Sequence, residues 1–124
     1  MIKKFAEKNT NYFYLVFRLL IGTLFFLHGW MKVSNIMAGK LNIISLMGVA
    51  GVIEVVAGIL IIIGLFVRCA ALISAIEMLV AFFKVHLPGG LNPLKNGGES
   101  AVLFFVAFLI LLAFGARKWA LDKK

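Results

Sequence analysis

The sequence has little cysteine, proline or acid, and each shortage excludes a class of protein. Its single cysteine, Cys69, excludes an intrachain disulfide and a CxxC redox pair. Its two prolines and a single Pro/Gly-rich stretch near Pro88 leave no long linker, so we expect one domain over residues 1–124. Charged residues make up 15% of the chain, which is too few to cover the surface of a soluble domain.

Apolar residues take the place of the missing charge. They account for 63% of the chain, and the mean hydropathy is +1.06. Lipid is therefore the expected solvent for most side chains. The net charge of +8 would favour nucleic acid in a soluble protein, but here the cations flank the apolar runs. Membrane lipid explains them better, and we expect no nucleic-acid partner.

Four apolar runs are long enough to be membrane-spanning helices, which need about 20 residues each. The expected helices cover residues 12–32, 43–63, 68–85 and 99–116. Gly64 stands where a helix C-cap is needed, and Pro88 ends the third run because the residue before a proline disfavours helix. The fold class is therefore an all-α, integral membrane four-helix bundle.

The lysines and arginines predict the orientation. One side of the membrane receives Lys3, Lys4, Lys8, Arg68, Arg117, Lys118, Lys123 and Lys124, and the other receives Lys32, Lys40, Lys84 and Lys95. The positive-inside rule then places both termini in the cytoplasm of a multi-pass plasma-membrane protein.

Three ionisable residues lie near the middle of the spans, where each costs about 2.5–3.5 kcal/mol. Arg18, Glu54 and Glu77 lie on stripes of small residues, which allow close helix packing with the charges facing inward. We expect a buried ion pair between Arg18 and either Glu54 or Glu77. The sequence leaves open which acid is paired, and whether the pair is purely structural.

A second polar cluster is expected toward the outer face. It contains His28, Lys32, Glu54, His86, Asn96 and Glu99. These groups are suited to an anion, a quinone carbonyl, a metal ion or proton relay. Two histidines alone make a poor metal site, so we expect no metal. Asn96 and Glu99 also fit a helix capping box, and Lys32 also fits a side chain that snorkels to the interface.

The order of these residues resembles the DoxX family. The matching positions are Arg18, Gly22, His28-Gly29, Lys32, Glu54, Gly58, Gly64, Arg68, His86, Asn96-Gly97-Gly98-Glu99, Gly115 and Leu121-Asp122. The resemblance covers nearly the whole chain. The tail departs from the family pattern, since Gly115-Ala116-Arg117 and Ala120 stand where a Gly-x-Gly and a Ser are expected.

The resemblance implies a membrane protein of the DoxX/DoxD type, a group that includes a subunit associated with thiosulfate:quinone oxidoreductase. The first functional hypothesis is therefore the membrane subunit of a quinone-linked oxidoreductase. Its outer pocket would hold a quinone, and a soluble redox partner would supply electrons, because the chain carries no catalytic motif or evident cofactor of its own. The alternatives are a non-catalytic membrane assembly factor, a small-molecule binder or carrier, and a proton-coupled exporter working as a homo-oligomer.

Overall fold

The structure is a computed structural model that describes residues 1–122, apart from the side chains of Leu94 and Asn96. Over these residues the chain is helical and contains no strand, which confirms the all-α class. Lys123 and Lys124, which contribute to the predicted orientation, lie outside the described residues.

Four long helices agree with the four predicted runs, and two short ones were not predicted. The helices are α1 (Ile2–Lys8), α2 (Thr10–Met37), α3 (Leu46–Ile63), α4 (Val67–Ala81), α5 (Pro93–Asn96) and α6 (Glu99–Phe114). After α4 the chain continues as a π-helical turn, Phe82–His86, and a 3₁₀ turn, Leu87–Gly89. The short additions are α1 and α5.

Helix boundaries follow local capping more closely than hydrophobic length. The second long helix begins after Ser45, whose Oγ accepts a hydrogen bond from Gly48 N at 3.1 Å. The first extends beyond Lys32 to Met37, and the chain then reaches Gly39 in the left-handed conformation, with φ 75°. Gly64 caps α3 with φ 74°, as predicted.

Helix α6 begins at Glu99 as expected, and its N-cap residue is Gly98 rather than the predicted Asn96. The side chain of Asn96 lies outside the described atoms, so its hydrogen bond to the start of α6 stays a prediction.

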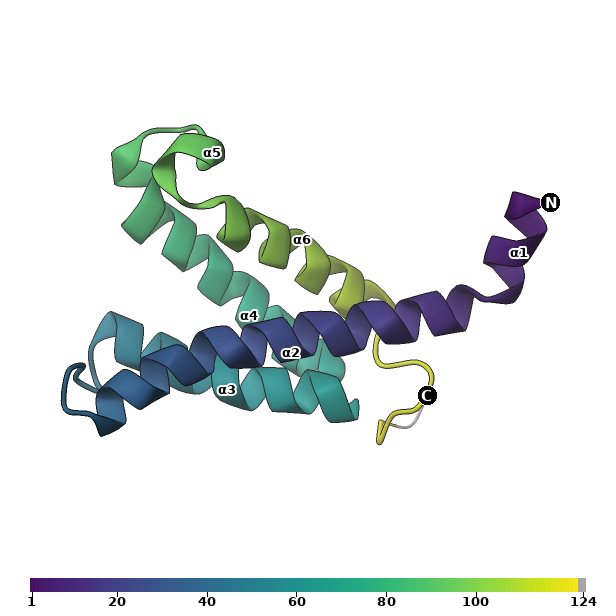
Figure 1. Ribbon diagram of the computed structural model, residues 1–124, viewed down its shortest axis with the longest axis horizontal. Coiled ribbons are helices and arrows are strands. Elements are labelled where there is room, and N and C mark those ends of the chain that lie inside the picture. The colour runs from purple at the N-terminus through teal and green to yellow at the C-terminus, as the bar shows by residue number, and fades with distance from the viewer. Residues whose placement is uncertain (123–124) are drawn as a thin grey trace.

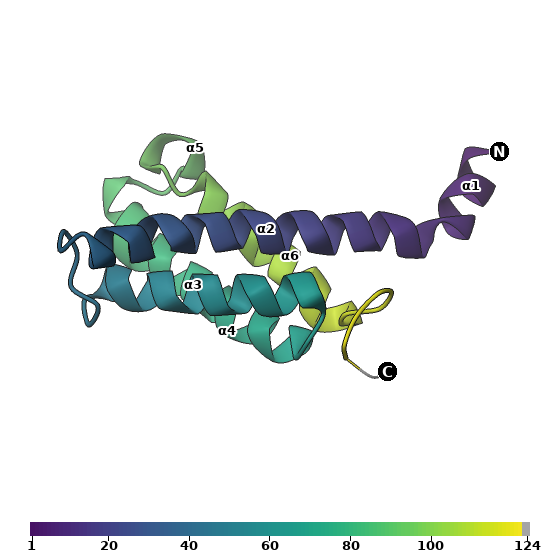
Figure 2. The ribbon, with the colours of Figure 1, turned by 60° about the horizontal axis from the view of Figure 1, so that its bottom comes forward.

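The long helices form two antiparallel pairs. Helix α2 lies along α3, and α4 lies along α6; α3 and α4 join the pairs (Figures 1 and 2). The pairs diverge toward the loop 38–45 and toward α5 (Figure 1). At the opposite end, α1 and the C-terminal segment emerge on the same side of the molecule (Figure 1).

Glycines set the close approach of α2 and α3. A Cβ atom on Gly29 would lie 2.6 Å from Val55 N, and one on Gly58 would lie 2.7 Å from Phe26 N. No side chain fits at either position, so the two backbones pack directly against each other. This confirms the predicted role of the small-residue stripes. An aromatic core of Phe25, Phe104 and Phe108 fills the space toward α6.

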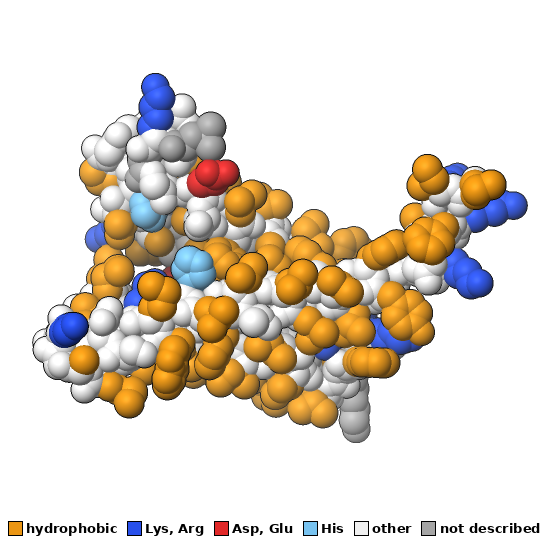
Figure 3. All heavy atoms as spheres, viewed as in Figure 1, with side chains coloured by type: hydrophobic (Ala, Val, Ile, Leu, Met, Phe, Trp, Pro, Cys, Tyr) orange, Lys and Arg blue, Asp and Glu red, His pale blue; other side chains and the backbone are white. Residues whose placement is uncertain are grey.

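The surface is that of a membrane protein. Hydrophobic side chains cover most of the face in Figure 3. Three helical segments, Thr10–Met37, Leu46–Ile63 and Val67–Gly89, are long and apolar enough to cross a bilayer. Helix α6 is apolar but has 16 residues, a length of about 24 Å against a hydrocarbon core of about 30 Å.

Candidate functional site

A buried ion pair joins α2 to α3. Lys32 Nζ lies 2.5 Å from Glu54 Oε2. The Glu54 side chain is 1% exposed, and that of Lys32 is 23% exposed. A Cβ on Gly51 would lie 2.6 Å from Lys32 Cβ, so glycine allows the lysine stem to cross α3. The pair is buried at its acidic end and reaches the surface at its basic end.

Glu77 brings a second carboxyl to this pair from α4. It lies beside Glu54 and within electrostatic reach of Lys32. Both of its oxygens are shielded from solvent, and the carboxyl of Glu54 is their polar neighbour. The buried hydroxyl of Ser74, one turn earlier on α4, has no hydrogen-bond partner among the described residues. A buried polar group without a partner costs about 1–3 kcal/mol, so packing alone does not account for the polar groups on this face of α4.

Arg18 is not part of this cluster. The predicted ion pair of Arg18 with Glu54 or Glu77 is wrong, because Arg18 bonds to backbone carbonyls and Glu54 pairs with Lys32. The Arg18 side chain is 1% exposed. It donates to the carbonyl oxygens of Ala116 at 2.6 Å, Lys118 at 2.8 Å and Trp119 at 2.7 Å. Because α2 and α3 are antiparallel, Arg18 lies opposite the end of α3, whereas Glu54 lies opposite Gly29.

The remaining residues of the predicted outer pocket are spread over three elements. His28 is exposed on α2, and its ring packs edge-to-face on Phe104 of α6 with centroids 5.3 Å apart. His86 ends the π-helical turn and lies beside Gly97. Glu99 is exposed at the start of α6. Figure 3 shows histidine, carboxylate and basic side chains around the hollow between the two helix pairs.

Among the described side chains of the predicted outer pocket, Lys32 and Glu54 form an ion pair. His28 packs on Phe104 instead, and the side chain of Asn96 lies outside the described atoms. Among the described residues, no three His, Cys, Asp or Glu side chains come together as a metal-binding group. A shared site for the whole predicted set remains a prediction.

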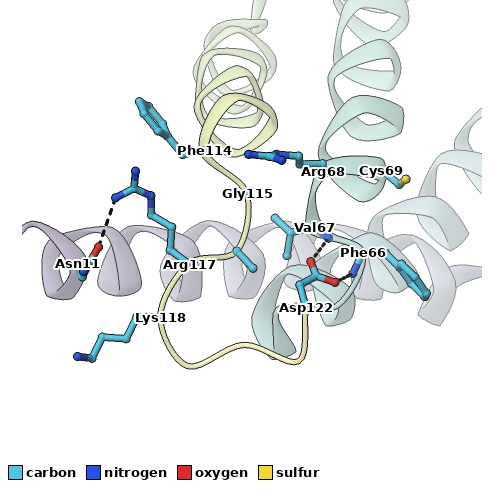
Figure 4. Close-up of a pocket in the computed structure, with 11 residues that line it drawn as sticks. Asn11, Phe66, Val67, Arg68, Cys69, Phe114, Gly115, Arg117, Lys118 and Asp122 are labelled. Carbon is cyan, nitrogen blue, oxygen red and sulfur yellow. Dashed lines mark hydrogen bonds between the residues drawn. The ribbon is translucent and has the colours of Figure 1, made fainter. Parts of the chain in front are cut away.

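The C-terminal segment is a structural feature that the sequence analysis missed. Tyr14 Oη donates to Gly115 O at 2.5 Å. The Asp122 carboxylate accepts hydrogen bonds from Phe66 N at 2.6 Å and Val67 N at 2.9 Å, which caps the start of α4 (Figure 4). The C-terminal segment is therefore hydrogen-bonded to the helices although its sequence departs from the family pattern at Ala116-Arg117 and Ala120. The match at Leu121-Asp122 was the available signal for this contact.

Chemically, the Lys32–Glu54–Glu77 cluster has donors, acceptors and one more acid than base. Removing two negative charges from water beside one ammonium is unfavourable, and one proton on the acid pair restores neutrality. Such a group can donate a hydrogen bond to a carbonyl and can exchange a proton with a ligand. These helices and this buried polar cluster define an integral membrane protein with a polar site between its helices.

Comparison with known proteins gives the family. The sequence model of the DoxX family matches residues 13–87, a region that includes Lys32, Glu54 and Glu77. The chain belongs to the DoxX family, as the resemblance predicted.

Two relatives come from Haemophilus influenzae (strain ATCC 51907 / DSM 11121 / KW20 / Rd), and both are described as uncharacterized proteins. One is 40% identical over 126 residues, which cover 95% of this chain and 94% of the relative. The other is 35% identical over 69 residues, which cover 56% of this chain and 46% of the relative. No solved structure matches.

Proposed function

We propose that this DoxX-family protein is the membrane subunit of a quinone-linked oxidoreductase. The observation that carries the proposal is the pair of acids on facing helices, Glu54 and Glu77, which lie side by side and share one cation, Lys32. Ionisable groups inside a membrane are costly, and they are usually kept for ligand or proton pathways.

The cluster suits a quinone head group. A quinone carbonyl accepts hydrogen bonds, and Lys32 and a protonated Glu77 are donors of the required kind. His28 lies one turn before Lys32 on the same helix, and its contact with Phe104 supplies flat rings nearby. Reduction of a quinone consumes two electrons and two protons. In this proposal a soluble redox partner supplies the electrons, and the acid cluster passes the protons.

The proposed membrane arrangement has four crossings in the plasma membrane, with both termini in the cytoplasm. Lys3, Lys4, Lys8, Arg68, Arg117 and Lys118 lie at the end that holds the termini. The positive-inside rule favours the cytoplasm for that end. The Lys32–Glu54 pair then lies in the outer half of the membrane.

The second candidate is a non-catalytic binder or assembly factor. It is favoured by the Lys32–Glu54 contact, because an ion pair that satisfies itself can serve helix packing alone. Under this alternative, replacement of Glu77 would not change the affinity for quinone.

The test is quinone binding by purified protein in detergent. Co-purifying small molecules are identified by mass spectrometry, and a short-chain quinone is titrated while tryptophan fluorescence is followed. We expect Lys32→Met to weaken binding by about tenfold, the value of one lost hydrogen bond to a charged group. Glu77→Met should weaken it by about fivefold, the value of one lost neutral hydrogen bond.

Glu7→Met is the matched control, because Glu7 is an exposed carboxylate on α1. It should leave quinone affinity unchanged. Thermal unfolding of each variant separates loss of binding from loss of fold. Quinone affinity that is absent in the wild type, or equal in all four well-folded proteins, would reject the proposal and favour the binder or assembly factor.

A further inference from the structure

A cavity lies at the other end of the molecule from the Lys32–Glu54 pair, where the first turn of α4 meets the segment after α6. Its volume is about 800 Å³. Arg68 of α4 and Arg117 of the C-terminal segment both line it and are exposed (Figure 4). Lys118 also lines it, with its ammonium over the Tyr12 ring at 4.3 Å, and the Arg117 guanidinium lies over the Phe114 ring at 5.1 Å. The guanidinium groups of Arg68 and Arg117 are the cations best suited to a phosphate, because each has a planar fork of N–H donors.

The single acid in the lining does not neutralise these arginines. Asp122 accepts hydrogen bonds from Phe66 N and Val67 N through its two carboxylate oxygens. Figure 4 shows this carboxylate turned to the start of α4, away from the Arg117 guanidinium. The cavity therefore carries an excess of positive charge.

The two arginines keep donors for a ligand. Arg68 donates to Ala113 O at 3.3 Å, and Arg117 donates to Asn11 Oδ1 at 3.3 Å. Both hydrogen bonds are long, and a guanidinium group has five N–H donors in a geometry that matches the oxygens of a phosphate. A phosphate group is the natural ligand for such a pair.

An apolar groove adjoins the basic cavity. It has a volume of about 420 Å³ and is lined from both sides by α3 and α4. Its lining is Val52, Ile53, Val56, Ala57, Leu60, Phe66, Cys69, Ala70 and Ile73. Phe66 and Cys69 line both spaces, so the groove and the cavity meet at the first turn of α4.

We propose that the basic cavity and the groove together bind one anionic phospholipid. The phosphate of the head group contacts Arg68 and Arg117, and an acyl chain lies in the groove along α3 and α4. The two parts of the site match the two parts of the molecule, and basic pockets between membrane helices bind anionic head groups in this way. This site is separate from the Lys32–Glu54–Glu77 cluster and does not depend on the function proposed for it.

The experiment measures lipid binding to the full chain in detergent by native mass spectrometry and by thermal shift. Phosphatidylglycerol is compared with phosphatidylcholine and with inorganic phosphate. We expect phosphatidylglycerol alone to bind and to raise the melting temperature. Each charge contributes about fivefold to affinity, so Arg68→Gln and Arg117→Gln should each weaken phosphatidylglycerol binding by about fivefold. Lys8→Gln is the matched control, because Lys8 is an exposed cation on α1 outside the cavity lining, and it should change phosphatidylglycerol binding less than twofold.

A second pair of variants tests the groove. Val56 and Val106 are similarly exposed, 52% each, and Val56 lines the groove whereas Val106 lies on α6 outside it. Val56→Trp should weaken lipid binding about tenfold while Val106→Trp leaves it unchanged. Equal binding of phosphatidylcholine would overturn the anionic selectivity. Displacement of the lipid by inorganic phosphate at matched concentration would show that the site serves a soluble anion.

Discussion

Arg18 of α2 holds the C-terminal segment against the helices through hydrogen bonds. Its guanidinium is buried and donates to three carbonyl oxygens of that segment, those of Ala116, Lys118 and Trp119. These carbonyls follow the end of α6 and have no strand or helix to satisfy them. A buried charge is tolerated here because dipoles of the backbone surround it.

Replacing Arg18 by methionine should therefore destabilise the protein strongly. The change keeps the apolar stem but leaves the three carbonyls without their donor, at about 1–3 kcal/mol for each buried acceptor. Arg18→Lys should recover part of the loss, since lysine keeps the charge but lacks the planar fork. Thermal unfolding in detergent measures both. Arg117→Met, which removes an exposed guanidinium, should cost less than about 1 kcal/mol. A fall in melting temperature no larger than that of Arg117→Met would show that Arg18 does not hold the C-terminal segment in place.

Asp122 gives a second prediction at this scale. Asp122→Ala removes the acceptor for Phe66 N and Val67 N at the start of α4. Loss of a helix N-cap of this kind costs about 0.5–2 kcal/mol. Asp122→Asn should retain part of the stability, because an amide oxygen can still accept one of the two hydrogen bonds. Hydrogen exchange should show faster exchange confined to the first turn of α4. Uniformly faster exchange along the chain would argue against a local cap.

The partner of Glu54 shows what single residues reveal before a structure is known. The sequence identifies Glu54 and Glu77 as costly groups on inward faces and Lys32 as a member of the outer polar cluster, and the structure places all three together. The sequence does not reveal the register between α2 and α3, so Arg18 rather than Lys32 was expected to pair with Glu54. An antiparallel pair with a short loop was a usable signal, because it sets Lys32 near the start of α3 and Arg18 near its end.

At the scale of elements, the contact between α2 and α3 depends on glycine. Gly29, Gly51 and Gly58 each occupy a place where a Cβ would come within 2.8 Å of an atom of the facing helix. At Gly29 the nearest atoms belong to the backbone and to Glu54 Cβ. Movement there must shift the whole helix, and Glu54 moves with it.

Gly29→Ala should therefore destabilise the helix pair and disturb the Lys32–Glu54 contact. In an isolated helix the change is worth about 1 kcal/mol in favour of alanine, whereas overpacking costs about 1–3 kcal/mol. We expect the overpacking to dominate, with a lower melting temperature in detergent. Thr23→Ala is the control, since Thr23 is exposed on the same helix. An unchanged or higher melting temperature for Gly29→Ala would show that the helices separate at little cost.

Element boundaries were predictable where a single residue dictates them and not where membrane thickness was used instead. Gly64 and Glu99 mark the predicted ends, since a left-handed cap and a helix start depend on neighbouring residues. The end of α2 was placed at Lys32 from hydrocarbon thickness, but nothing in the backbone stops the helix there. It continues to Met37, just before Gly39.

At the scale of the whole molecule, the sequence predicts which faces are buried but not how the helix pairs meet. Helices α2 and α3 are joined by glycine contacts, and α4 and α6 by Ala101, Phe104 and Phe108 with the small residues of α4. The tail then crosses the end of both pairs through hydrogen bonds to backbone atoms. Backbone carbonyls are present in every residue, so the hydrophobic pattern of the sequence cannot predict these hydrogen bonds.

The tail also makes the number of crossings testable. Leu121 N donates to Ile63 O at 3.2 Å, and Asp122 N donates to Gly64 O at 2.7 Å. The end of the chain is thus held at the turn between α3 and α4. The loop 38–45 and α5 lie at the far end of the molecule (Figure 1). Helix α6 has to cover the distance between these ends although its length is below the usual span.

We predict that cysteine labelling will place Asn35 and Asn92 outside the membrane and Lys3 and Leu121 inside. Each is replaced by cysteine in a Cys69→Ser background, because the native Cys69 is exposed and would react. A membrane-impermeant maleimide added to intact cells should label only the first two, and all four should react after permeabilisation. Reversed labelling would contradict the charge-based orientation and move the Lys32–Glu54–Glu77 cluster toward the cytoplasm. Leu121 labelled together with Asn92 would show that α6 does not cross, and that the tail contacts to Ile63 and Gly64 do not form in the membrane.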